Sequence, residues 1–297
     1  MIKLLGQYKN GNYTTKIFND GTRIRFTDDD YFKAAFAENI DVKITNCCDL
    51  NCQFCHENSN INGKHGDIEK FFDTLHPYQE IALGGGNILY YPKIRELLQK
   101  LRDKKVITNI TLNQKHFMDN INTLLEWYTS GLYYGLGVSF THQEKNFLHF
   151  ISLIPNSVVH IINGVINKDD LNYLSNHDIK LLILGYKQLR RGQDFYNKYK
   201  EDILINQKYL SDNILNLFKK FKVVSFDNLA LKQLDLKNKL SKEVWQRFYQ
   251  GDDGSSTFYI DLVNKEFAKS STSMERYKLL DNVDDMFKVI QNSYEKI

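Results

Sequence analysis

Three cysteines in one short segment could hold a metal centre. Residues 46–56 read NCCDLNCQFCH, so Cys48, Cys52 and Cys55 form a C-x3-C-x2-C run. Three thiolates from one loop can bind three irons of a 4Fe–4S cluster, which leaves the fourth iron without a protein ligand. That iron could bind an outside molecule and pass an electron to it. The spacing therefore predicts a redox site that is open to a small molecule.

A zinc knot and a set of buried thiols are the alternative interpretations of this segment. A structural zinc site usually pairs a C-x2-C with a second ligand pair well separated in the sequence. Here the remaining cysteine is Cys47, directly beside Cys48, and we interpret it as a spare buried thiol. All 4 cysteines are clustered, so they cannot form a disulfide framework for 297 residues. We therefore favour the iron–sulfur interpretation.

Composition is that of an ordinary globular protein, with 42% hydrophobic and 25% charged residues. No segment approaches the roughly 20 apolar residues that span a bilayer, and the first residues do not resemble a signal peptide. Clustered free cysteines favour a reducing compartment, so we expect a cytoplasmic protein without a membrane partner. The net charge of +3 permits an anionic small molecule, and direct nucleic-acid binding is not expected.

Alternating strand and helix patterns predict an α/β fold. Residues 2–27 have the turn signals of a β-meander, and a short helix is expected over 30–37. A strand over 40–45 then leads into the cysteines. Further strands, each followed by a helical pattern, are expected at 80–83, 107–112, 135–140, 158–162 and 181–184. This order predicts a partial (β/α)6 TIM-like barrel with its functional loops at the carboxyl ends of the strands.

The remaining segments are expected to complete a single domain over 1–297. A helix over 212–220, a strand over 222–226 and a β-hairpin over 257–269 follow the barrel units. We divide the chain into an N-terminal β-rich cap, the partial barrel core and a C-terminal extension, which cover 1–39, 40–230 and 231–297.

The cysteine run, with Phe54 between its last two cysteines, resembles the cluster loop of the radical S-adenosylmethionine (radical SAM) superfamily. The resemblance implies a 4Fe–4S cluster at Cys48, Cys52 and Cys55, with S-adenosylmethionine on the open iron. It also implies reductive cleavage of S-adenosylmethionine to methionine and a 5′-deoxyadenosyl radical, which takes a hydrogen from the substrate. A flavodoxin- or ferredoxin-type protein would donate the electron.

A glycine-rich segment one strand later extends the resemblance. Gly85 and Gly86 match the superfamily's "GGE" element, whose backbone carbonyls bind the methionine amino group. Asn87 stands where Glu is common, and Ile88 stands where Pro is common. A tight strand–helix turn is the alternative for these glycines.

Later strand ends carry the other residues that the resemblance assigns to the cofactor. Ser139 would bind the ribose, although a serine that only packs the barrel is the alternative. Asn113 ends an intervening strand and faces the same mouth. The segment 160–165, with Ile162, resembles an apolar-Gly element whose backbone contacts adenine, and Phe54 would lie beside the same base.

Two segments are candidates for binding the substrate. The first is basic and follows a strand, which suits a phosphate or carboxylate, although a solvated turn is the alternative. The second pairs a donor with an acceptor and suits a heterocycle edge or sugar hydroxyls. The candidates are Tyr186, Lys187, Arg190, Arg191, Asp227 and Asn228. The hydroxyl-rich stretch 269–273 could add phosphate contacts or could be a plain loop.

Beyond the cysteine run, no cysteines remain for an auxiliary cluster. This argues against sulfur insertion and favours redox-neutral or reductive chemistry on a small molecule. The compact build is similar to that of the queuine lyases of queuosine salvage, which implies a phosphorylated nucleoside-like substrate. In that reaction the radical takes a hydrogen from the ribose of queuosine 5′-phosphate, and breakage of the C–N glycosidic bond releases queuine for tRNA modification. Glycyl-radical activation, another nucleoside or peptide modification, and a non-enzymatic zinc module are the alternatives.

Overall fold

The computed structural model describes residues 2–294 and begins with an antiparallel three-stranded sheet. Its strands are β1 (Leu4–Asn10), β2 (Tyr13–Phe18) and β3 (Arg23–Phe26). The turns fall at Gly11 and Gly21, whose φ angles of 59° and 90° suit glycine. The predicted β-meander is therefore confirmed.

The helix predicted over residues 30–37 is wrong. The backbone N–H groups of this segment donate to side chains of the first hairpin instead of to carbonyls one turn earlier. Asn10 Oδ1 accepts from Ala35 at 2.7 Å and from Phe36 at 3.0 Å, and Asn12 Oδ1 accepts from Lys33 at 2.7 Å. Long-range amide contacts thus replace the helical hydrogen bonds that the local pattern suggested.

The large sheet has the order β10-β9-β8-β7-β6-β5-β4-β11-β12-β13. Neighbouring strands from β4 to β10 are parallel, and each connection between successive strands contains a helix. The strands are β4 (Asn39–Thr45), β5 (Glu80–Gly85), β6 (Ile107–Asn113), β7 (Gly135–Ser139), β8 (Ser157–Ile162), β9 (Lys180–Leu184) and β10 (Val223–Phe226). The predicted α/β fold with a partial barrel is confirmed.

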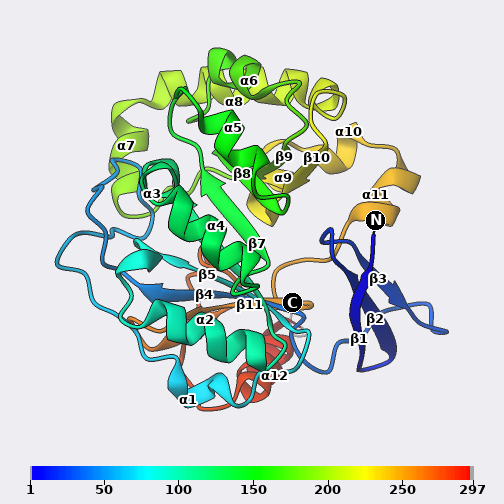
Figure 1. Cartoon of the computed structure of the whole chain (residues 1–297). Helices are drawn as coiled ribbons and strands as arrows, with labels where there is room; N and C mark the ends of the chain where they lie inside the picture. Colours follow the sequence, from blue (N-terminus) through cyan, green and yellow to red (C-terminus); the bar gives the residue numbers. More distant parts are fainter. Residues whose placement is uncertain (1, 295–297) are drawn as a thin grey trace.

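The helices of this part lie on the outside of the curved sheet (Figure 1). They are α1 (Glu69–Phe72), η1 (Ile88–Tyr90), α2 (Ile94–Asp103), α3 (Gln114–Asp119), α4 (Ile121–Thr129), α5 (Phe147–Ser152), α6 (Lys168–Leu174), α7 (Arg191–Lys198) and α8 (Lys200–Leu217). In α2 the buried positions Leu97, Leu98 and Leu101 repeat at helical spacing and pack into the core. For α8, the helix predicted over 212–220 covers only the C-terminal end of the observed helix.

The C-terminal segment returns to the sheet. It contains α9 (Asn228–Gln233), α10 (Leu236–Lys239), α11 (Lys242–Phe248), β11 (Thr257–Asp261), β12 (Glu266–Ala268), β13 (Tyr277–Lys278) and α12 (Val283–Tyr294). β11 and β12 form the predicted hairpin, and β11 also pairs in parallel with β4. The ring of Phe287 in α12 lies 6.0 Å from that of Phe258 in β11 and covers its outer face. The hairpin therefore extends the barrel sheet itself.

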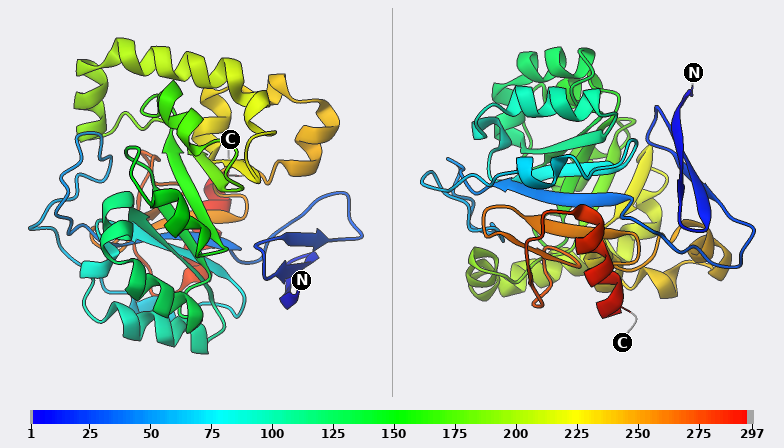
Figure 2. Two further views of the ribbon diagram at one scale, coloured as in Figure 1. Left: turned by 45° about the horizontal axis from the view of Figure 1, so that its top comes forward. Right: turned by 90° about the horizontal axis from the view of Figure 1, so that it is seen from below.

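Side chains alternate between the two faces of β4. Ile40 and Ile44 are fully buried under the outer layer, whereas Asn39, Asp41 and Lys43 line a cavity of about 790 Å³ inside the barrel. The meander lies at the end where β4 begins, and the cysteine loop lies at the opposite end (Figure 2). Among residues 2–294, no helix is long and apolar enough to cross a membrane.

Candidate active site

The cysteine loop leaves the carboxyl end of β4 at the mouth of the barrel. The backbone N–H of Cys48 donates to the Asn60 carbonyl at 2.9 Å, and Cys47 forms a β-bridge with Asn60. These contacts close the segment into a loop in which all four cysteines are partly buried. The Cys47 thiol donates to the Ile61 carbonyl at 3.3 Å. It therefore has a partner of its own within the loop.

The distances between the thiols help to distinguish a site for an iron–sulfur cluster from a site for a single zinc ion. With Zn–S bonds of about 2.3 Å, the sulfurs of one tetrahedral zinc lie about 3.8 Å apart. Among residues 2–294, the metal-ligating atoms that gather within 4.8 Å of one another belong to Cys48, Asp49 and His116, and the three cysteines form no such group. A hydrogen bond of 2.7 Å between His116 and Asp49 explains that contact without a metal. The three thiols are therefore not all at the spacing that one tetrahedral zinc ion requires.

The thiols nevertheless share one electrostatic environment. Burial raises the pKa of Cys52, and the neighbouring Cys55 and Cys48 raise it further, while Arg191 opposes them. Metal binding requires thiolates, so a guanidinium beside Cys52 favours the ligating form. The donor set of the C-x3-C-x2-C loop therefore fits an iron–sulfur cluster.

The glycine-rich segment packs directly against the start of the cysteine loop. Gly86 N–H donates to the Thr45 carbonyl at 2.8 Å, and Asn87 N–H donates to the Cys47 carbonyl at 2.7 Å. A Cβ on Gly86 would lie 2.2 Å from the Cys47 carbonyl oxygen, so this approach requires glycine. Gly85, with φ of 116°, and Gly84 line the cavity. The segment therefore contacts both the cysteine loop and the cavity.

Other residues that were predicted to contact the cofactor make local contacts. The Asn87 side chain is buried and accepts from Leu89 N–H at 3.1 Å, so it caps η1. Asn113 accepts from Lys115 N–H at 2.9 Å and caps α3. Phe54 packs edge-to-face on Phe195 of α7, with ring centroids 5.7 Å apart. Each of these side chains already has a structural role.

Ser139 and the inner face of β8 lie on the cavity. Ser139 ends β7 and lines the cavity, as does His160 of β8, and Ile162 follows on the same face of that strand. Gly137 makes room for the imidazole, because a Cβ there would lie 2.3 Å from His160 Cε1. Burial lowers the pKa of His160 to about 4, so the imidazole is neutral at neutral pH.

The two predicted phosphate-binding arginines hold the cysteine loop instead. Arg190 donates to the His56 carbonyl at 2.6 Å. Arg191 donates to the Ser59 carbonyl at 2.6 Å and also to Asn51. Neither arginine lines the cavity. Guanidinium donors suit loop carbonyls as well as they suit phosphate, and the sequence does not distinguish the two.

The other four substrate candidates divide in the same way. Tyr186 is buried, and its hydroxyl donates to the Gly192 carbonyl at 2.8 Å. Lys187, Asp227 and Asn228 do meet at the cavity. Lys187 Nζ donates to Ser271 Oγ at 2.9 Å, which places the hydroxyl-rich stretch beside it. Burial raises the pKa of Asp227, and Lys187 opposes this shift.

A buried ion pair network that the sequence did not predict connects the loop to the barrel. Lys43 Nζ lies 2.7 Å from Glu57 and 3.1 Å from Asp261, so one ammonium joins β4, the cysteine loop and β11. Tyr259 also donates to Glu57 at 3.2 Å. The signal was present in the sequence: β4 alternates polar and apolar residues, although parallel strands covered on both faces are usually apolar throughout.

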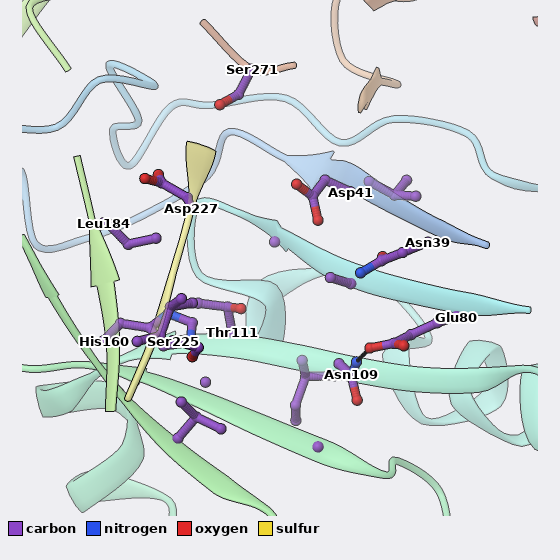
Figure 3. Close-up of a pocket in the computed structure, with 18 of the residues that line it drawn as sticks. Asn39, Asp41, Glu80, Asn109, Thr111, His160, Leu184, Ser225, Asp227 and Ser271 are labelled. Carbon is purple, nitrogen blue, oxygen red and sulfur yellow. Dashed lines mark hydrogen bonds between the residues drawn. The ribbon is translucent and has the colours of Figure 1, made fainter. Parts of the chain in front are cut away.

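Polar and apolar side chains both line the cavity, and Leu184 is one of the apolar ones (Figure 3). Side chains reach it from strands on all sides of the barrel, and among them are Asn39, Asp41, Glu80, Asn109, Thr111, His160, Ser225 and Asp227. Ligand sites in barrels lie at the carboxyl end of the strands. The cysteine loop and the glycine segment occupy that end here.

No protein-family model and no curated protein matches the sequence. Among solved structures, the fold is similar to that of SuiB from Streptococcus suis. The structure of SuiB bound to precursor peptide SuiA has a TM-score of 0.57 and 14% identity, over 87% of this chain and 65% of that chain. The structure of SuiB bound to S-adenosylmethionine has a TM-score of 0.55 and 13% identity, over 88% of this chain and 66% of that chain. The chain thus spans just under two thirds of SuiB and shares its fold.

Proposed function

We propose that this protein is a radical SAM enzyme. One observation carries the proposal: the C-x3-C-x2-C loop leaves β4 at the mouth of the cavity, and the glycine segment at the end of β5 is hydrogen-bonded to it, from Asn87 N–H to the Cys47 carbonyl. A redox centre with one open iron would therefore lie beside a cavity of substrate size. The SuiB structure with S-adenosylmethionine, similar over 88% of this chain, supports the same cofactor here.

The cysteine loop and the glycine segment would each hold one of the two cofactors. Cys48, Cys52 and Cys55 would hold a 4Fe–4S cluster, and Gly85 and Gly86 would let S-adenosylmethionine approach the backbone. When bound, these groups supply a 5′-deoxyadenosyl radical that takes a hydrogen atom from a substrate. The chain's own residues position the substrate and exclude water.

The specific reaction that we propose is lysis of queuosine 5′-phosphate to release queuine. Because the two arginines already hydrogen-bond to the cysteine loop, the phosphate would be bound by Lys187 and by the hydroxyls of Ser270 and Ser271. Asp227 and Asn228 would contact the base or the sugar. The radical would take a ribose hydrogen and leave a sugar radical. Queuine would then leave with the electron pair of the C–N glycosidic bond and a proton from a sugar hydroxyl, and the unpaired electron would stay on the oxidised sugar until it takes back a hydrogen atom from 5′-deoxyadenosine.

Peptide modification is a second candidate, and one observation favours it. SuiB was crystallised with precursor peptide SuiA, and its fold covers most of this chain. A peptide side chain could enter the same cavity from the mouth. The two candidates share the cofactors and differ in the substrate.

The test is anaerobic purification, reconstitution with iron and sulfide, reduction, and assay of 5′-deoxyadenosine with and without queuosine 5′-phosphate. We expect substrate-stimulated deoxyadenosine together with queuine. Formation of 5′-deoxyadenosine without queuine would exclude queuosine 5′-phosphate as the substrate and would still support a radical SAM enzyme. A colourless protein with stoichiometric zinc that forms neither product would refute the proposal.

The adjacent cysteines provide a matched control. Cys52→Ser should lose the iron–sulfur absorbance and deoxyadenosine formation, because the cluster loses a ligand. Cys47→Ser changes the neighbouring thiol, which hydrogen-bonds within the loop, and should retain both signals. Equal loss in the two variants would contradict the ligand assignment.

A further inference from the structure

One carboxylate inside the barrel has no partner. Asp41 lies on the inner face of β4, between the cavity residues Asn39 and Lys43. Lys43 is fully engaged with Glu57 and Asp261. Asp41, in contrast, makes no hydrogen bond or ion pair within residues 2–294, and its accessible surface faces the cavity (Figure 3).

A second unpartnered acceptor lies two residues earlier on the same face. Asn39 Oδ1 is buried and has no hydrogen-bond donor in the described part of the chain. A buried polar atom without a partner costs roughly 1–3 kcal/mol. Asn39 Oδ1 is such an atom, and the unpaired Asp41 carboxylate lies beside it on the cavity wall, so one ligand in the cavity could donate to both.

The electrostatic surroundings specify the charge of that ligand. Burial raises the pKa of Asp41 to about 6; Lys187 opposes the shift, and Asp253, Glu80 and Asp227 add to it. Three carboxylates thus outnumber one ammonium around Asp41. A cation placed there would reduce this repulsion and restore the charged form of Asp41.

The other cations on the cavity are occupied elsewhere. Arg23 pairs with Glu38 and Glu80 at the meander end. Lys180 donates to the Asp20 carbonyl and to Asn156 Oδ1, both at 3.2 Å. None of the cavity's own cations therefore pairs with Asp41 among residues 2–294.

We infer that Asp41 and Asn39 bind a protonated amine or guanidinium group of the substrate. This inference rests on the proposed function, because it takes the cavity to be the substrate site of the radical enzyme. It narrows the substrate class to molecules that carry a cationic nitrogen. An anionic end, where the substrate has one, would lie toward Lys187. A small nucleoside-like molecule and a peptide with a basic side chain can both supply the cation.

The test measures binding and needs no turnover. The full-length protein is titrated with n-pentylamine and with 1-pentanol, before and after iron–sulfide reconstitution, and affinity is followed by ligand-observed NMR. We expect the amine to bind at least 10-fold more tightly than the alcohol, which differs mainly in its charge. Asp41→Asn should remove this preference, and Asn39→Ala should reduce it. Asp178→Asn, on an exposed loop, is the matched control and should leave it unchanged.

Two further probes distinguish the source of the cation. 7-Aminomethyl-7-deazaguanine represents a nucleobase amine, and Nα-acetyl-lysine amide represents a peptide. The one that binds more tightly in an Asp41-dependent manner identifies the class.

Equal affinity of the wild type and Asp41→Asn for n-pentylamine would overturn the inference, as would equal affinity of the wild type for both pentyl probes. If Asp41→Asn does not fold, the inference is tested by the effect of Asn39→Ala on amine binding and by the difference between the wild-type affinities for the two pentyl probes. Failure of the radical proposal appears separately, as absence of 5′-deoxyadenosine from a protein that still binds the amine.

Discussion

Two carboxylates three residues apart have opposite surroundings, because Glu38 is buried and Asp41 is exposed to the cavity. Glu38 is fully buried and accepts hydrogen bonds from Tyr13, Arg23 and Arg25, with both guanidinium contacts at 2.8 Å. Asp41 has no partner at all among the described residues. A buried charge that stabilises a fold is paired, because an unpaired one is costly. An unpaired charge that is exposed to a cavity is instead available to a ligand.

The comparison extends to the two ends of the barrel. At the meander end, Gly21 N–H donates to the Tyr134 hydroxyl at 2.9 Å, and that hydroxyl donates to the Phe18 carbonyl at 2.6 Å. Together with the Glu38 network, these bonds attach the meander to the barrel. At the other end, the loops carry the cysteines and the cavity opens. The contacts that hold the meander and the loop that carries the cysteines therefore lie at opposite ends of the strands, and the cavity with Asn39 and Asp41 lies between them.

The largest effect should come from removing a paired cation. Arg23→Ala leaves buried Glu38 with Arg25 as its remaining cation and Glu80 with none, so the free energy of unfolding should fall by about 3 kcal/mol in urea denaturation. Arg95→Ala removes an exposed pair with Glu126 and should cost at most about 1 kcal/mol. Equal costs in the two variants would break the comparison.

The contact of Arg191 with the cysteine loop should affect cluster binding. Arg191→Gln removes the donor to the Ser59 carbonyl and the positive charge beside Cys52, so iron affinity should fall by about 10-fold. Iron content after reconstitution at limiting iron measures this. Lys198→Gln, an exposed change in the same helix, serves as the control, and a matching loss there would contradict the role of Arg191.

The two carboxylates should give opposite dependences of stability on pH. Burial raises the pKa of Glu38, but Arg23 and Arg25 outweigh it, so the pKa is lowered overall from 4.5. Its contribution is therefore present above about pH 4.5 and is lost as the pH falls below it. The pKa of Asp41 is raised from 3.8 to about 6, so its contribution is present below about pH 4 and is lost as the pH rises through about 6.

Urea denaturation between pH 3.5 and 7 measures both dependences. The stability of the wild type relative to Glu38→Gln should fall toward the acid end of this range. Its stability relative to Asp41→Asn should fall toward neutral pH. If both stability differences changed with pH in the same direction, the two carboxylates would not have opposite effects on stability.

The smallest effect should be that of Asp41→Asn on stability at pH 7. The variant removes a charge that repels its neighbours, so the free energy of unfolding should rise, by less than about 1 kcal/mol because water in the cavity screens the charge. Differential scanning calorimetry measures it. A loss of more than about 2 kcal/mol would show that Asp41 is a structural residue.

Local patterns predicted the strands, most of the outer helices and the position of the cysteine loop. They failed where distant side chains replace local bonds, as at residues 30–37, where Asn10 and Asn12 accept the backbone N–H groups. They also did not predict that Arg190 and Arg191 hold loop carbonyls, because a basic loop has the same composition whether it binds phosphate or loop carbonyls. Asp41 was missed, although the alternation of β4 signalled a polar inner face.

The sequence by itself determined the chemistry that the cysteine run can support and the order of strands and helices, because both depend on residue types at short spacing. Only the tertiary structure decided which charges are paired. Lys43 meets Asp261, and Arg23 meets Glu80, across long stretches of chain, whereas Asp41 meets no partner. Pairing depends on three-dimensional distances that strand order and side-chain direction set together, and no local pattern contains them.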